Sequence, residues 1–170
     1  MEGRTVKDSR VVLAQHMGIS ESNLAGAVHG GVIMKLVDTA GGIAAAKYSG
    51  GPVVTVAIDE MSFIEPVKLG DLVTVTASVN GVGTTSMEVG VRVETENILT
   101  GVKVHTSTAY LLFVALDPKT KRPCKVPPLI AETPDEKRRM GEAEVRRKAR
   151  LARREAILAG RAAAQKSASS

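Results

Sequence analysis

One long helix followed by four β-rich segments is the feature of this sequence that most restricts its fold. The helix is predicted over residues 30–48, because apolar residues recur there at spacings of three, four and seven. At 1.5 Å of rise per residue it would be roughly 28 Å long. The apolar stripe consists of Ile33, Leu36, Val37, Ala40, Ile43 and Ala44.

Strand-like segments surround this helix and are joined by short links. A short apolar run precedes it, a polar, glycine-bearing loop leads into it, and four segments rich in β-branched residues follow it. The apolar run is 10–15, the loop is 18–28, the later strands are 53–63, 72–79, 86–94 and 102–116, and the links are 68–71, 80–83 and 97–101.

The short links favour antiparallel neighbours, and a single helix must bury its apolar face against the resulting sheet. We therefore predict an α+β fold, an antiparallel sheet wrapped around one long helix. Five strands leave an edge strand exposed, which favours dimerisation by edge pairing.

The pair Gly41-Gly42 lies inside the predicted helix, where each glycine costs roughly 1 kcal/mol relative to alanine. Glycine has no side chain to hold two surfaces apart. The pair therefore predicts close contact of the helix with a curved sheet or with another subunit.

A change of composition at Thr133 divides the chain into residues 1–133 and 134–170. Thr133 suits an N-cap, Pro134 suits the first helical position, and Glu136 completes a capping box. A long helix is predicted over about 137–164, with a sparse apolar stripe interrupted late by Gly160, and residues 167–170 are predicted to fray. The stripe consists of Met140, Val145, Leu151, Ile157 and Leu158.

The positive charge of the protein belongs to this C-terminal segment. The whole chain carries a formal net charge of +5, yet residues 134–170 carry +6 and residues 1–133 carry −1. Three roles fit a basic helix: a solvated surface helix, a helix packed on a neighbouring subunit, or an electrostatic partner for the phosphates of a ligand or for another polyanion. The segment has no aromatic residues for base stacking, which disfavours nucleic acid.

Composition restricts location and chemistry. Cys124 is the only cysteine, no segment approaches the roughly 20 apolar residues that span a bilayer, and the first residues lack an apolar secretory region. We predict a cytoplasmic protein that does not bind membranes. Histidine and cysteine lack metal-ligand spacing, and no P-loop, dinucleotide fingerprint or Gly-x-Ser-x-Gly motif is present, so no metal and no cofactor are predicted.

His29-Gly30-Gly31 precedes the long helix and is the first candidate for chemistry. Free N–H groups and the positive end of the helix dipole could there stabilise the oxyanion of a tetrahedral intermediate. The alternative is that the glycines only allow a tight turn into the helix.

Asp38 lies two turns further along the same helix, about 100° round from the edge of the apolar stripe, and is flanked by Gly41, Gly42 and Ala45. If another surface buries it partly, its pKa should rise and it becomes a plausible general base. An ordinary exposed helical aspartate is the alternative.

Asn23 lies in the glycine-bearing loop, where its amide could polarise a carbonyl or orient a water, or only form a turn. His29 and His105 have the same structural alternative.

These residues resemble a known family. The segment Asn23–Gly42 resembles the active-site segment of the hotdog acyl-CoA thioesterases, of the bacterial YciA type and the brain acyl-CoA hydrolase type. The resemblance covers about residues 8–133, and the run 97–101 and the pair Pro127-Pro128 make the brain type especially similar. It continues through residues 53–57, 63–67, 83–87 and 96–101.

The resemblance implies a single hotdog domain that hydrolyses acyl-CoA. It implies that Asp38 is the catalytic base or nucleophile, with Asn23 opposite it across a dimer interface and the amides of Gly30 and Gly31 facing the thioester oxygen. Dimers of this family commonly form a trimer of dimers. The residues implied to hold coenzyme A are Val54, Thr55, Val56, Thr85 and Ser86.

Two positions depart from the family. Relatives often carry Asn or Asp where this chain has Ala27, and the bacterial type has Phe in place of His29. The brain enzyme divides the two key residues between two domains, whereas Asn23 and Asp38 share one domain here, so a homodimer could hold two equivalent sites.

Two other functions remain open from the sequence. One is a hotdog module that binds acyl-CoA without hydrolysing it, as a regulator. The other is a hotdog dehydratase, which usually pairs a histidine with an acid and would use His29.

Overall fold

A computed structural model describes residues 1–168, apart from the side chains of residues 163 and 166–168. The structure is α+β, as predicted. Its elements are β1 (Arg4–Thr5), α1 (Val6–Ser9), β2 (Val11–His16), the 3-10 turn η1 (Ile19–Glu21), α2 (Gly30–Ser49), β3 (Val53–Phe63), β4 (Asp71–Val82), β5 (Ser86–Asn97), β6 (Lys103–Ala115), β7 (Leu129–Ile130) and α3 (Pro134–Ala168).

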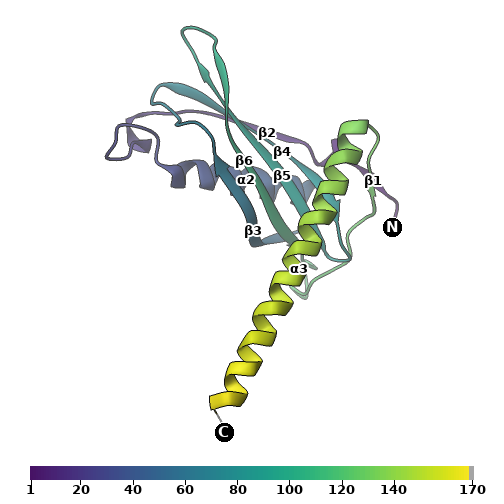
Figure 1. Cartoon of the computed structure of the whole chain (residues 1–170). Coiled ribbons are helices and arrows are strands. Elements are labelled where there is room, and N and C mark those ends of the chain that lie inside the picture. The colour runs from purple at the N-terminus through teal and green to yellow at the C-terminus, as the bar shows by residue number, and fades with distance from the viewer. Residues whose placement is uncertain (169–170) are drawn as a thin grey trace.

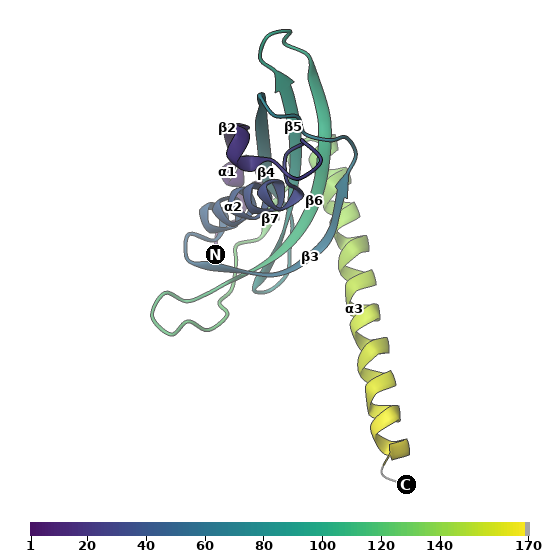
Figure 2. The same ribbon diagram turned by 90° about the vertical axis from the view of Figure 1, so that its left-hand side faces the viewer.

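The main sheet has five strands in the order β2-β4-β5-β6-β3, and every neighbouring pair is antiparallel. The sheet curves around α2, and α3 runs across its opposite, outer face (Figures 1 and 2). The predicted order of one strand, one helix and four strands is therefore confirmed. The edge strands are β2 and β3.

The buried face of α2 is rotated from the predicted stripe. Ile33, Val37, Ala40 and Ala44 are buried as predicted, but Leu36 is only half-buried and Ile43 is 40 % exposed. Gly41, Ala45 and Tyr48 are buried in their place.

The ring of Phe113 on β6 explains the rotation. A Cβ at Gly41 would lie 3.1 Å from this ring, and one at Gly42 would lie 3.7 Å away. Of the two predicted reasons for the glycine pair, the structure shows close contact with the curved sheet.

The C-terminal end of α2 is anchored. The helix ends at Gly50, which has a left-handed φ of 75°, and Tyr48 donates a hydrogen bond from its hydroxyl to the carbonyl oxygen of Pro127 at 3.2 Å. Burial raises the pKa of Tyr48 to about 12, so the phenol stays neutral in the core.

The N-terminus forms structure that the sequence did not predict. β1 pairs in parallel with β7, and Arg4 donates from Nη1 to the carbonyl oxygen of Tyr48 at 2.6 Å. Each strand has only two residues, too few to show a strand pattern. This pair ties the beginning of the chain to the segment that leads into α3.

β4 extends beyond its predicted end. The sequence predicted a link at residues 80–83, but β4 continues to Val82 through a bulge between Val79 and Gly81. Asn80, in the bulge, lies across Gly90 of β5, where any Cβ would collide with its side-chain amide. Asn80, which suggested a turn, therefore lies within β4, and the absence of a side chain at Gly90 leaves room for its amide.

α3 begins at Pro134, and its predicted capping box is present. The Thr133 side chain accepts from the N–H of Glu136 at 3.2 Å, and Glu136 accepts from the N–H of Thr133 at 3.0 Å. The helix passes through Gly160 without a break and continues to Ala168. The fraying predicted for residues 167–170 concerns in part residues 169 and 170, which lie outside the described residues.

Residues 134–153 of α3 pack on the outer face of the chain's own sheet, an arrangement that none of the three predicted roles included. Arg146 donates to the buried Glu88 of β5 at 2.7 Å and lies 3.6 Å from the ring centroid of Tyr110 on β6. Arg150 forms an ion pair with Asp59 of β3, whose side chain is also buried. Within residues 1–168, no helix is both long and apolar enough to cross a membrane.

The contact between Gly41 and Phe113 gives a stability prediction. Gly41→Val adds methyl groups where the ring already lies, and we expect a loss of about 1–3 kcal/mol in the free energy of unfolding. Gly42→Ala places its Cβ at an ordinary contact distance, so helix propensity should raise stability by up to about 1 kcal/mol. Urea unfolding of both variants measures the effects. Equal stability of Gly41→Val and the parent would contradict the assigned contact.

Candidate active site

Asp38 and Thr55 meet where α2 passes the edge strand β3. The hydroxyl of Thr55 donates to Oδ1 of Asp38 at 2.8 Å. Thr55 lies immediately before a bulge in the pairing of β3 with β6, and Asp38 is exposed in the single chain. The carboxylate is therefore held at one oxygen and open to solvent, and the partial burial considered from the sequence would need a second surface.

His29 is the N-cap of α2. Its Nδ1 accepts the N–H of Gly31 at 2.8 Å, so this nitrogen is unprotonated here. Among the described residues no hydrogen bond is recorded for the N–H of Gly30. Of the two amides predicted to face an oxyanion, one is open and the other is occupied by the imidazole.

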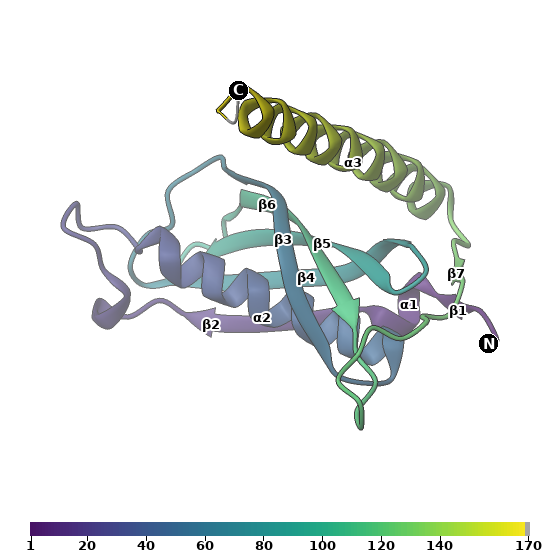
Figure 3. The same ribbon diagram turned by 90° about the horizontal axis from the view of Figure 1, so that it is seen from below.

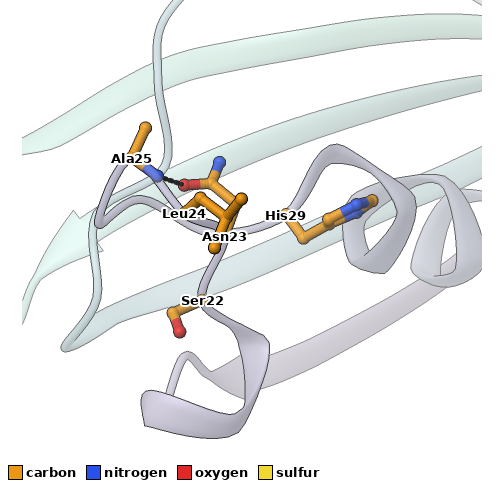
Figure 4. A pocket seen from close by; sticks show the side chains of 5 residues that line it. All are labelled: Ser22, Asn23, Leu24, Ala25 and His29. Atoms are coloured by element: carbon orange, nitrogen blue, oxygen red, sulfur yellow. Dashed lines mark hydrogen bonds between the residues drawn. The ribbon is translucent and has the colours of Figure 1, made fainter.

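Asn23 is held in the loop before α2 with a defined orientation. Its Oδ1 accepts from the backbone N–H groups of Ala25 at 2.9 Å and Ala27 at 3.1 Å. Figure 4 shows the amide nitrogen directed away from Ala25. Asn23 therefore forms the turn that its residue type predicts and still offers Nδ2 as a donor. Ala27 takes part only through its backbone.

An open pocket connects Asn23 with the start of α2. Its lining residues are Ser22, Asn23, Leu24, Ala25 and His29 (Figure 4).

Asp38 does not meet this pocket within its own chain. Asp38 is eight positions after Gly30 in the helix, which corresponds to roughly 12 Å along the axis. One thioester carbonyl cannot contact both, because hydrogen-bond donors act at about 3 Å. Each chain therefore holds two separate groups of candidate residues. One is at the start of α2, at Gly30, and the other is two turns later, at Asp38.

Two of the residues implied to hold coenzyme A, Val54 and Ser86, lie in one row across three strands. Val114 of β6 pairs with Val54 of β3 on one side and with Ser86 of β5 on the other. Two strand spacings separate Val54 from Ser86, about 10 Å. Thr85 precedes this row, and its carbonyl oxygen accepts from the N–H of Ala115 at 2.9 Å.

Large apolar side chains are exposed along the β3 edge and in the loop before α2. Leu24 is fully exposed, and Val56 and Phe63 are each about half exposed. The ring of Phe63 would lie 3.6 Å from a Cβ at Gly30, so this apolar edge reaches the start of α2. Such a surface is typical of an interaction site.

The other candidate groups are structural. His105 contacts Oγ1 of Thr108 at 2.8 Å and the carbonyl oxygen of Ser107 at 3.1 Å, both in its own strand. In the described part of the chain, no group of three or more His, Cys, Asp or Glu residues could hold a metal ion.

Comparison with known sequences identifies the family. The family model described as thioesterase superfamily matches residues 25–102, from the loop before α2 into the link after β5. The acyl-CoA thioester hydrolase YkhA of Bacillus subtilis is 36 % identical over 135 residues, which cover 79 % of this chain and 78 % of the relative. The chain belongs to the acyl-CoA thioester hydrolases of the thioesterase superfamily.

A longer relative agrees with this assignment. The cytosolic acyl coenzyme A thioester hydrolase of Rattus norvegicus is 33 % identical over 147 residues, which cover 85 % of the thioesterase described here. The matched part spans only 38 % of the rat enzyme's length.

Solved structures support the hotdog fold. A hexameric acyl-CoA thioesterase in its apo form superposes with a TM-score of 0.87 at 31 % identity, covering 90 % of this chain and 97 % of that one. The acyl-CoA hydrolase of Staphylococcus aureus, solved with butyryl coenzyme A and coenzyme A, superposes at 0.84 with 30 % identity, covering 91 % and 93 %. Three further structures of the S. aureus enzyme carry single alanine substitutions, at an asparagine, an aspartate and a threonine.

Two contacts of the thioesterase were missed from the sequence. Thr55 was assigned only to coenzyme A, although its hydroxyl holds Asp38, and His29 was not assigned as a helix cap. A capping role could have been inferred from the position of His29 immediately before the helix, whereas the Thr55 contact depends on the packing of β3 beside α2.

The cap gives a prediction on stability. His29→Ala removes the acceptor for the Gly31 N–H, and we expect a loss of about 0.5–2 kcal/mol in the free energy of unfolding. His29→Asn keeps a side chain that caps well and should lose less. Urea unfolding of the two variants tests this, and equal losses in both would show that the cap contributes nothing.

Proposed function

We propose that this thioesterase hydrolyses acyl-CoA to free coenzyme A and a carboxylic acid. Family membership supports the reaction class. The observation that carries the proposal is the Asp38 carboxylate, held by Thr55 at the exposed β3 edge.

Asp38 acts on water or on the thioester itself. With Oδ1 held by Thr55, Oδ2 has no recorded hydrogen bond among the described residues and can accept a proton from water. The water oxygen then bonds to the thioester carbon, and the C–S bond breaks as the thiolate takes the proton from Asp38. In the nucleophilic form, Asp38 bonds to that carbon and coenzyme A leaves as the thiolate. Water then hydrolyses the resulting anhydride, which regenerates the Asp38 carboxylate and releases the acid, and a proton of that water goes to the thiolate.

The oxyanion site comes from a second subunit. Because Gly30 lies roughly 12 Å from Asp38 along the helix, Asp38 of one chain needs the α2 start of another. There the open N–H of Gly30 and Nδ2 of Asn23 can both donate to the carbonyl oxygen. The N–H of Gly31 joins them if His29 releases it.

The substituted positions of the S. aureus enzyme support these three residues. Its asparagine and aspartate are fifteen positions apart, and its aspartate and threonine are seventeen apart. Asn23, Asp38 and Thr55 are separated by the same intervals.

Coenzyme A lies along the row that joins β3 to β5. Val54, Thr55 and Val56 line the pantetheine arm, and Thr85 and Ser86 lie toward the nucleotide. Thr55 uses its hydroxyl for Asp38, so its contact with pantetheine is through the backbone. No cofactor is needed, because coenzyme A is part of the substrate and product.

The assembly that provides two complete sites is a homodimer joined at β3. Its exposed apolar edge supports this pairing, and trimers of such dimers give the hexamer. Residues 1–133 form the catalytic unit and residues 134–170 its helical extension, in a cytoplasmic enzyme. The non-enzymatic acyl-CoA module and the dehydratase have less support: binding alone does not need Asp38, and His29 is engaged as a cap.

Mixing two inactive variants tests the shared site. Asp38→Asn and Asn23→Ala are each expected to lower kcat by about 10²–10⁴-fold, measured as thiol release from a panel of acyl-CoA chain lengths. Unfolding and refolding the two together yields mixed dimers in which one site has both native residues. Activity should then return to about a quarter of the parent level, since half of the dimers are mixed.

Two results would contradict the proposal. No thiol release by the parent chain with any chain length removes the hydrolase function. No recovery on mixing, with mixed dimers shown by mass, places Asn23 and Asp38 in the same subunit's site.

Thr55 separates catalysis from binding. Thr55→Ala removes the hydroxyl that holds Asp38, so kcat should fall by about tenfold or more with a smaller change in KM. Thr55→Ser keeps the hydroxyl and should retain most of the rate. A raised KM with unchanged kcat in Thr55→Ala would assign Thr55 to coenzyme A binding alone.

A further inference from the structure

α3 crosses the strands of the outer face one after another. Ala143 packs over Gly81 of β4, Arg146 reaches Glu88 of β5, and Arg150 and Arg153 both reach Asp59 of β3. Since β3 is the edge strand, the helix arrives at the edge of the sheet between residues 150 and 153.

The rest of α3 continues past this edge. Residues 154–168 correspond to about 22 Å of helix, and Figures 1 and 2 both show this part extending beyond β3 with no element of the chain beside it. Figure 3 shows α3 on the side of the sheet opposite α2. Residues 151–162 are all exposed.

Apolar side chains around the crossing have no cover within the chain. Leu151 is 51 % exposed and Leu158 is 52 % exposed. On the other flank of the helix, alanines at 149, 152 and 156 are exposed and would allow a close approach there. Ile157, four residues after Arg153, continues the helix face that contacts the sheet.

A second copy joined at β3 would occupy this space; this step rests on the homodimer proposed above. Two antiparallel β3 strands are related by a two-fold axis that passes between them near their midpoints. Asp59 lies near the middle of Val53–Phe63, so α3 crosses close to that axis. The two α3 helices then lie on the same face of the joined sheet and run in opposite directions.

We propose that α3 pairs antiparallel with α3 of a second copy, with the contact centred on Leu151 and Ala152. The end of each helix then lies over the outer face of the partner's sheet. Charge supports this register, because a centre at 151–152 brings Lys148 of one helix level with Glu155 of the other. Neither residue has a salt bridge within its own chain among the described residues.

Cysteine cross-linking in the full-length protein tests the pairing. In a Cys124→Ser background, Leu151→Cys and Ala152→Cys are each treated with a short bismaleimide, and Ala162→Cys is the matched control on the exposed helix. At least one of the two central variants should form a covalent dimer in most of the protein. The control should not, because its two cysteines would lie roughly 30 Å apart.

The outcomes separate this proposal from the proposed function. Native mass and thiol release are measured on the same samples before cross-linking. An active dimer without cross-links at either central position, or one that cross-links at 162, overturns the α3 pairing and leaves the hydrolase intact. A monomer without thiol release overturns the function and the pairing together.

Discussion

The contact between α2 and the curved sheet is the constraint on which the rest of the structure depends. Because Gly41 lacks a side chain, the ring of Phe113 reaches the helix backbone, and the buried face of α2 includes Gly41 and Ala45 opposite β6. Asp38 then lies at the margin of the buried face, beside the edge strand, where Thr55 can hold it. Packing, not helix periodicity, sets the direction of the carboxylate.

Because α2 is one continuous helix, it fixes the distance between the two groups of candidate catalytic residues. The helix keeps Gly30 and Asp38 roughly 12 Å apart, so in the proposed mechanism the oxyanion donors and the carboxylate of one chain serve different sites. His29 caps the helix by accepting the N–H of Gly31. In the proposed mechanism, a thioester oxygen could use the same N–H. The N–H of Gly31 therefore stabilises the free protein and, in that mechanism, turns to the substrate only if His29 releases it.

Sequence patterns predicted most of the fold because its main elements are long and strongly periodic. The helix, the five strands and the cap of α3 at Thr133 were all found in this way. The predicted buried face of α2 was partly wrong. Helix periodicity counts only apolar residues, whereas in the structure small residues packed on Phe113 also form the buried side. For the site, Asp38, Asn23 and the glycines could be proposed from motif and resemblance, but the hydroxyl of Thr55 on Asp38 depends on the distance between two elements far apart in sequence.

The outer face of the sheet carries two acids with buried side chains, Asp59 and Glu88, each of which is contacted by an arginine of α3. Each has one oxygen without a hydrogen-bond partner among the described residues, and the arginines of α3 supply the opposing charge. A carboxylate left under an apolar cover without its arginine would be strongly destabilising. We therefore expect these acids and the arginines at 146 and 150 to change together during evolution. In a related sequence, the residues at the positions of 59 and 88 should then indicate whether its C-terminal helix folds back over the sheet.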